Sequence, residues 1–410
     1  MDQHKLYRTI KLLAEEKHRT EDQLLAHILE NIIANEEIPI RGGRIWKLEP
    51  ASLAYRLIHQ AGDMEPIAKN FRIKISDYPA FKNLAKRGTI VDIETNKYLR
   101  QRGIKHYSAT GFGEKVEADS TAFYQYLLAI NADYLKHDMV YTLNILATAL
   151  TSSLTSRRSA KKAKLLEADL DKAKAIQQSI LPAHEFKFFQ YDLYGVSVPE
   201  RIVGGDFFDY LQAKDDKDRL GVAIGDAASK GLSAAAQALY VSGALRMGVE
   251  FQTKMSHLIN RLNEMVNRTF TAEHFISMVY AELTNAESGL VSYVNAGHSN
   301  PILLHAATNE AERLRATGQI IGPFPHEKYR TEFAIMRPGD VLLLYTDGIS
   351  EAANEKHELF GEHRLIHLLR EHRKESPKEL CYAILQEVQT HGSLEEYSDD
   401  KTLVVIRRSR

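Results

Sequence analysis

The sequence predicts a multidomain α+β protein in which a long helical segment separates two regions that mix strands and helices. Three observations predict this organisation. Apolar residues recur at helical spacing up to residue 36 and at a period of about two from Arg44 onward. Residues 156–180 contain no Gly or Pro and are rich in Ala, Lys, Leu and Glu, which favours an unbroken helix. Beyond Pro182, strands and helices alternate, and aspartates stand beside several strands.

The composition is that of an ordinary soluble globular protein. The 410 residues suffice for about two to three domains, and 44% of them are hydrophobic and 26% charged. Lys plus Arg number 53 and Asp plus Glu number 54, which gives a formal net charge of −1. The sequence therefore has no excess of positive charge that would favour nucleic acid or an anionic membrane as a partner. The single cysteine, Cys381, excludes an intramolecular disulfide and a cysteine-based zinc cluster. We expect a cytoplasmic protein, because neither a signal peptide nor a membrane span is recognisable.

The first 155 residues form two predicted blocks. Residues 1–36 are predicted to be N-terminal helices, the second of which begins at a capping box made by Thr20 and Gln23. Residues 37–155 are predicted to be one domain of strands with helical insertions. Its expected strands are 44–48, 53–62, 89–93 and 123–130, and its expected helices are 78–87, 95–101 and 133–154.

This second block resembles a GAF sensory domain in the order of its elements, over about residues 20–155. The resemblance implies a domain that forms a homodimer and binds an unknown small ligand or none. No cysteine lies in the block to tether a bilin. The three scattered histidines, His59, His106 and His137, are interpreted as structural residues and not as ligands.

The helical segment, predicted as a linker over residues 156–181, carries a short heptad pattern. Its apolar seam consists of Ala163, Leu166, Leu170, Ala173, Gln177 and Ile180. This spacing favours a two-helix coiled coil that joins a sensor dimer to an output dimer. A solvated linker helix that packs on its own domain is the alternative.

The last predicted domain, residues 182–410, brings aspartates to strand termini. Its expected strands are 192–198, 202–203, 219–224, 276–283, 289–296, 341–345 and 402–407, and its expected helices are 232–248 and 255–270. Asp206 is expected to follow the strand that ends at Val203, and Asp226 and Asp347 to follow strands of their own. Gathered carboxylates repel one another unless a cation neutralises them, and carboxylate oxygen suits Mg²⁺ or Mn²⁺ and not zinc. The sequence therefore predicts a two-metal hydrolase.

Five motifs in this domain carry a family resemblance. They read V-G-G-D-F-F-D, G-D-A-A-S-K-G-L-S-A-A, N-A-G-H-S-N-P, P-G-D-V-L-L-L-Y-T-D-G-I-S-E-A and S-D-D-K-T-L-V-V-I. Together they resemble the metal-dependent PPM serine/threonine protein phosphatases, in particular the bacterial branch that dephosphorylates anti-sigma-factor antagonists. The resemblance covers about residues 183–408. It implies an αββα sandwich, in which helices flank two central and mostly antiparallel sheets.

The same resemblance implies a site for two divalent cations, Mn²⁺ or Mg²⁺. The implied ligands are Asp206, Asp226, the backbone carbonyl of Ala227, Asp347 and Asp399, with Asp400 as the alternative to Asp399. Asp226 would bridge both cations, and the water activated between them would attack phosphoserine or phosphothreonine on an antagonist protein without a phosphoenzyme.

Other polar residues in the motifs have two interpretations each. Arg201 is a phosphate clamp or a surface salt-bridge residue, since a guanidinium can hold two phosphoryl oxygens. Lys230 adds positive charge or caps its turn, and the cap is favoured. Asp209 orients Asp206 or a metal-bound water, or simply completes its turn, and the orienting role is favoured. His298 is interpreted as a turn residue in place of a general acid, and Asp340 as structural.

Two departures from the family pattern leave an alternative function open. Ala228 stands where other branches place a histidine that is proposed to protonate the leaving group. Gly205 stands where some branches have a glutamate. These changes leave open a catalytically weak phosphatase-like module that binds a phosphoprotein. A two-metal nuclease is disfavoured, because the sequence has no basic bias.

Overall fold

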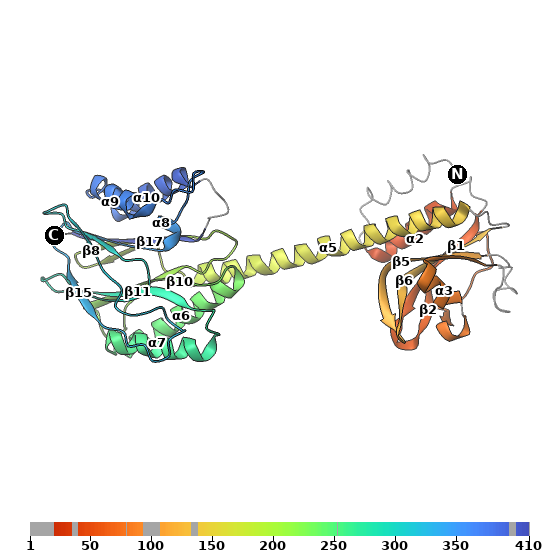
Figure 1. Cartoon of the computed structure of the whole chain (residues 1–410), viewed down its shortest axis with the longest axis horizontal. Helices are drawn as coiled ribbons and strands as arrows, with labels where there is room; N and C mark the ends of the chain where they lie inside the picture. The colour runs from red at the N-terminus through yellow and green to blue at the C-terminus, as the bar shows by residue number, and fades with distance from the viewer. Residues whose placement is uncertain are drawn as a thin grey trace. The chain divides into compact units, whose positions relative to one another are not determined.

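The computed structural model describes residues 20–34, 40–78, 80–92, 107–132, 138–251, 253–392 and 399–409. The chain divides into two compact units, Met1–Leu165 and Leu166–Arg410, which are treated separately below (Figure 1). The helix predicted before residue 20, the helix predicted over residues 95–101, and His106 and His137 lie outside the described residues. No helix in the described ranges is both long and apolar enough to span a lipid bilayer.

The first unit is built on one six-stranded antiparallel sheet, in the order β3-β2-β1-β6-β5-β4. Its elements are α2 (Glu21–Ile33), β1 (Ile40–Glu49), η1 (Pro50–Ser52), β2 (Ala54–Gly62), β3 (Arg72–Lys74), η2 (Ile75–Asp77), α3 (Ala80–Arg87), β4 (Thr89–Asp92), β5 (Tyr107–Ala118), β6 (Thr121–Ala132) and the start of α5 (Asp138–Ile180). The sequence predicted α2, β1, β2, α3, β4 and β6, and Thr20 caps α2 by accepting a hydrogen bond from the Gln23 amide.

Strand alternation divides the core of this unit between the two faces of the sheet. Ile45 of β1 faces the apolar stripes of α2 and of the first turns of α5. Trp46 points to the opposite face, where it joins a second cluster with residues of α3. Strand β5 was not predicted, because Gly111, Gly113 and an irregularity in pairing after Phe112 interrupt its apolar alternation.

Helix α5 is continuous over 43 residues and includes both predicted helical segments. No Gly or Pro occurs between them to end the helix. Leu165, Leu166 and Ile176 are exposed on its later turns. Gln177, which the heptad pattern assigned to the seam, is buried within its own chain and hydrogen-bonds to the backbone of Gly204. A seam between two copies of this helix therefore cannot use Gln177.

The second unit contains two antiparallel sheets, in the orders β15-β12-β11-β10-β9 and β14-β13-β16-β17-β8-β7. Its elements are β7 (Glu185–Phe188), β8 (Tyr191–Val198), β9 (Phe207–Leu211), β10 (Arg219–Ala227), α6 (Leu232–Glu250), α7 (Met255–Thr269), β11 (Ile276–Thr284), β12 (Leu290–Ala296), β13 (Ile302–Leu304), β14 (Ala311–Arg313), β15 (Glu332–Ile335), β16 (Val341–Tyr345), α8 (Asp347–Ser350), α9 (Gly361–Glu371), α10 (Pro377–His391) and β17 (Lys401–Arg408). Helices α6 and α7 cover the first sheet, and α9 and α10 cover the second (Figure 1). The predicted αββα sandwich is confirmed.

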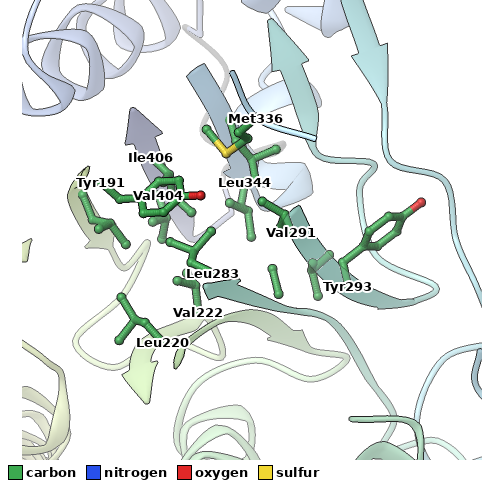
Figure 2. Close-up of a cluster of buried hydrophobic side chains, with 14 of the residues drawn as sticks. Tyr191, Leu220, Val222, Leu283, Val291, Tyr293, Met336, Leu344, Val404 and Ile406 are labelled. Carbon is green, nitrogen blue, oxygen red and sulfur yellow. The ribbon is translucent and has the colours of Figure 1, made fainter. Parts of the chain in front are cut away.

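The two sheets pack through one apolar layer, shown in Figure 2. Val222 of β10 and Val404 of β17 both point into this layer. Their neighbours Ala223 and Val405 point outward, toward α6 and α7 or toward α9 and α10. Because successive residues of a strand face opposite ways, these near-continuous apolar strands can bury both of their faces.

One predicted strand of this unit is wrong. Residues 202–203 form a bend and not a strand, and Asp206 therefore precedes β9 instead of following a strand. The chain here passes close to other groups. A side chain at Gly204 would collide with the Asp400 carboxylate, and one at Gly205 would collide with Ala234. The two glycines allow this close approach, because they have no side chain. The strand was predicted only because Ile202 and Val203 are both apolar.

Candidate active site

Antiparallel pairing brings the aspartates together at one edge of the two sheets. Phe207, which follows Asp206, pairs with Gly225, which precedes Asp226. In the other sheet, Tyr345 pairs with Leu403, so the segment after β16 lies beside the segment before β17. The end of one antiparallel strand meets the start of the next, so aspartates before and after strands reach the same edge.

Asp206 and Asp226 lie side by side in this cluster. Asp206 is buried, and the Thr346 hydroxyl donates a 2.7 Å hydrogen bond to its Oδ2. Burial raises the pKa of Asp206, and the charges of Asp226 and Asp400 raise it further. Burial likewise raises the pKa of Asp226, with the charges of Asp347 and Asp399 as the next causes. These groups repel one another in the absence of a neutralising cation.

Asp400 is held by the backbone of the loop that precedes β9. Its Oδ1 accepts a 2.8 Å hydrogen bond from the Glu200 amide. Its Oδ2 accepts hydrogen bonds of 2.6 Å from Gly205 and 3.3 Å from Asp206. A carboxylate with three backbone donors is strongly stabilised, and Asp400 thereby fixes the position of the neighbouring Asp206.

Asp399 differs from its neighbour, since its side chain is 51% exposed. Its Oδ2 lies 3.7 Å from the ammonium group of Lys230, which is also 3.5 Å from Glu200. Lys230 therefore places positive charge between two carboxylates, whereas the sequence favoured a turn cap. Asp347 begins α8, and burial and the Asp399 charge raise its pKa.

A pocket of about 150 Å³ opens over this cluster. It is lined by Glu200, Arg201, Asp226, Ser229, Lys230 and Asp399, among others. Arg201 is exposed and has no hydrogen bond or ion pair with any residue that the structure describes, so the salt-bridge interpretation gains no support. The carbonyl of Ala227, which closes β10, accepts a 2.6 Å hydrogen bond from the Ser229 amide.

The donor set suits a hard divalent cation in its chemistry. Carboxylate and carbonyl oxygens are the ligands that Mg²⁺ and Mn²⁺ prefer. Over the described ranges, however, no three Asp, Glu, His or Cys side chains form a finished set of ligands for one ion. Burial and the charges of neighbouring aspartates raise the pKa of Asp226, and a bound cation would offset the repulsion among these carboxylates.

Three residues singled out in the sequence lie away from this chemistry. Asp209 was expected to orient Asp206, but strand alternation turns it toward α6, where the Arg246 guanidinium contacts it at 2.6 Å. His298 is buried, and its amide donates to Asn295 within a turn, in agreement with the structural interpretation. Asp340 accepts hydrogen bonds from two backbone amides of neighbouring turns and is structural as predicted.

Three other residues of the site were missed. Thr346 orients Asp206, Glu200 contacts Lys230, and Glu351 lies close enough to Asp347 and Asp399 that their charges help raise its pKa. Each stands within six residues of an aspartate or arginine that the sequence did single out. Proximity to those residues was thus the available signal, although the contacts themselves depend on the tertiary fold.

The antiparallel αββα sandwich with aspartates gathered at one edge defines the class of PPM, or PP2C-type, phosphatase domains. The fold is similar to that of the SiaA PP2C domain of Pseudomonas aeruginosa, with a TM-score of 0.52, 20% identity, and coverage of 60% of this chain and 99% of that domain.

Residues 216–409, within the second unit, match the family described as stage II sporulation protein E (SpoIIE). The chain is 27% identical to phosphoserine phosphatase RsbU of Bacillus subtilis over 249 residues, which cover 59% of this chain and 71% of RsbU. It is 28% identical to protein IcfG of Synechocystis over 269 residues, which cover 59% of this chain and only 42% of IcfG.

Proposed function

We propose that this protein is a regulated, metal-dependent serine/threonine protein phosphatase. The observation that carries the proposal is the meeting of Asp206, Asp226, Asp347 and Asp399 at one edge of a PP2C-type sandwich, beside an open pocket. The family match of the second unit supports the same activity. The substrate is phosphoserine or phosphothreonine on a signalling protein, which we propose is an anti-sigma-factor antagonist.

Two divalent cations, Mn²⁺ or Mg²⁺, are the proposed cofactors. Asp206, Asp226, the Ala227 carbonyl, Asp347 and Asp399 would hold them. Bound cations would supply positive charge to the phosphoryl oxygens and lower the pKa of the attacking water. Asp399 is preferred to Asp400 as a ligand, because the Asp400 carboxylate already accepts three backbone hydrogen bonds.

Side chains of the pocket would bind and orient the phosphoryl group. Arg201 has an exposed guanidinium at the pocket wall, which can contact two phosphoryl oxygens at once. Asp400 supports this residue indirectly, because it fixes the amide of the preceding Glu200. Lys230 adds a second positive charge at the same wall.

The test is an assay of the purified full chain with Mn²⁺ on a phosphoserine peptide. Asp347→Asn should lower the rate by about 100-fold or more, since it removes a charge that a cation needs at close range. The matched control is Asp218→Asn, an identical change at an exposed aspartate before β10, and it should leave the rate unchanged. Activity that needs no metal, or that survives Asp347→Asn, would refute the proposal.

A catalytically weak binding module remains the second candidate, and Ala228 is the residue that favours it. This position lines the pocket but has no group that could protonate a leaving alkoxide. Calorimetry distinguishes the two: the enzyme binds Mn²⁺ and loses it on Asp226→Ala, whereas a degenerate module binds no metal.

We further propose that residues 37–155 are a GAF-like sensory domain that dimerises together with linker residues 156–181, in a cytoplasmic protein. The linker would act on the site through its last turns. The Gln177 amide bonds to both the N–H and the C=O of Gly204, two residues before Asp206. The Arg246 guanidinium joins the Ile180 carbonyl, at the end of α5, to Asp209 of β9.

Gln177→Leu tests this coupling. Loss of both hydrogen bonds to Gly204 should cost about 1 to 2 kcal/mol of stability in the second unit and change the phosphatase rate of the full chain. Gln178→Leu, at the exposed neighbouring position, is the control. Equal rates for the two variants would show that α5 is a passive connection.

A further inference from the structure

A buried arginine in the first unit has no acidic partner among the residues that the structure describes. Arg44 lies in the middle of β1, and only 2% of its surface is exposed. Its Nη1 contacts the Met64 sulfur and the Asn131 Oδ1, both at 3.3 Å, and its Nη2 donates a 3.1 Å hydrogen bond to the Glu65 carbonyl. All three acceptors are neutral groups.

No acidic group in the described ranges therefore compensates the charge of Arg44. No carboxylate in the described part of the chain forms an ion pair with it, and its buried Nε has no hydrogen-bond partner there. Burial lowers the pKa of Arg44 to about 10, so the guanidinium still carries its charge at neutral pH. An unpaired charge in the interior costs several kcal/mol, and a bound partner of opposite charge would offset that cost.

Arg44 faces a cavity of about 60 Å³ between the sheet and α3. The walls are mostly apolar, and three of their residues are aromatic: Trp46, Tyr78 and Phe81. The ring of Phe81 lies 5.6 Å from that of Tyr78. Since roughly 10 to 15 Å³ of such space holds one water molecule, the cavity has room for a small organic molecule.

We propose that this cavity binds a small organic monocarboxylate with an aromatic body, whose carboxylate pairs with the guanidinium of Arg44. The site is independent of the phosphatase site and of its proposed function. The Nε and Nη2 edge of a guanidinium matches a carboxylate side-on, and in Arg44 this edge includes the donor that lacks a partner. The aromatic walls would stack on the body of the ligand.

The chemistry of the cavity selects against other anions. Inorganic phosphate would bring a larger charge and a strongly held hydration shell to a wall with one guanidinium and mostly apolar surface. A neutral aromatic molecule would fill the space but leave Arg44 without its counter-charge. Only a ligand that combines one negative charge with an apolar body can both pair with Arg44 and pack against the apolar residues of the cavity.

The test uses the full chain with benzoate as the probe and Trp46 as the reporter. Trp46 is the single tryptophan of the sequence and lines the cavity. Benzoate should change its fluorescence in a saturable manner. Benzamide has the same shape without the charge. It should bind at least about 10-fold more weakly than benzoate, because a hydrogen bond to a charged group contributes about 1.5 to 3 kcal/mol. Inorganic phosphate should have no effect.

Two variants locate the binding. Arg44→Lys keeps the positive charge but loses the two-pronged geometry, and it should weaken benzoate binding by about 10-fold. Ala109→Leu extends a larger side chain into the cavity from β5 and should abolish binding while leaving Arg44 in place. The control is Arg41→Lys, at an exposed position of the same strand, which should bind as the unaltered chain does.

The proposal fails if neither benzoate nor a panel of larger aromatic monocarboxylates, such as naphthoate and indole acetate, gives a saturable change. It also fails if benzamide binds as tightly as benzoate, or if Arg44→Lys and Ala109→Leu both bind with unchanged affinity. A response to phosphate equal to that of benzoate would indicate a general anion site and would likewise contradict it.

Discussion

The two units of this chain bury uncompensated charge of opposite sign. The second unit gathers Asp206 and Asp226 with three further aspartates at a sheet edge, and burial, together with repulsion from neighbouring aspartates, raises the pKa of both residues. The first unit buries Arg44 in the middle of a strand, against neutral acceptors. A buried charge without a partner is costly, and a bound ion of opposite charge would offset that cost. This is the basis for proposing a cation in one unit and an anion in the other.

The surroundings of the two charges differ as much as their sign. The aspartates lie at or beside the ends of strands and at the start of α8, next to an open pocket of about 150 Å³. Ions and a protein substrate can therefore reach them from solvent. Arg44 lies on a sheet face covered by α3, and its cavity of about 60 Å³ admits only a small molecule. The first arrangement fits catalysis on a large substrate, and the second fits recognition of a small one.

The largest effect that tests this comparison is expected from Asp226→Asn. The change removes a negative charge from the centre of the aspartate cluster. Mn²⁺ affinity should fall by about 100-fold or more. Loss of a residue that only hydrogen-bonds to a metal ligand already lowers metal affinity by about 10- to 100-fold, and loss of a ligand itself should cost more. Without metal, the free energy of unfolding at pH 8 should instead rise by about 1 to 3 kcal/mol, because repulsion is relieved.

Calorimetry measures the first quantity and chemical denaturation in a chelator the second. Asp218→Asn should alter neither, because this exposed aspartate lies outside the cluster. If metal-free stability fell on Asp226→Asn, the carboxylate would be compensated within the protein. The contrast between the two units would then rest on Arg44 alone.

Much of the acidic site could be predicted because its signal is local. Each aspartate stands in a short motif beside an apolar strand, and the five motifs together identify the class of domain. The position of Asp206 before β9, and not after a strand, could not be predicted. It depends on Gly204 and Gly205, whose close approach to Asp400 and Ala234 exists only in the folded chain.

The cavity beside Arg44 had no comparable signal. A single arginine in an apolar strand has the pattern of a residue that faces solvent. Its burial depends on the cover that α3 and the segment around Met64 provide from elsewhere in the chain. The role of Asp209 was wrong for a similar reason, because its partner Arg246 is 37 residues away on α6.

A second prediction concerns the adjacent aspartates, Asp399 and Asp400. Asp400→Asn replaces one acceptor oxygen with a donor that faces backbone amides, so the unfolding free energy should fall by about 2 to 3 kcal/mol. Asp399→Asn alters an exposed side chain, so stability should change by less than about 0.5 kcal/mol. Mn²⁺ affinity should fall by about 10-fold or more in Asp399→Asn. The reverse pattern would make Asp400 the ligand.

The smallest expected effect is the change in the free energy of unfolding caused by Arg44→Met. A small change would itself support the view that Arg44 has no charged partner. Breaking a compensated buried pair costs about 3 to 5 kcal/mol because it leaves a buried charge unpaired, whereas Arg44→Met removes a charge that is already unpaired and leaves none behind. The unfolding transition that Trp46 fluorescence reports should therefore shift by about 1 kcal/mol or less. Arg56→Met, which removes the half-exposed partner of Glu49, provides the scale for a paired arginine. A loss of 3 kcal/mol or more in Arg44→Met would mean that neutral acceptors such as Asn131 already compensate the charge, and the inference of an anionic ligand would fall with it.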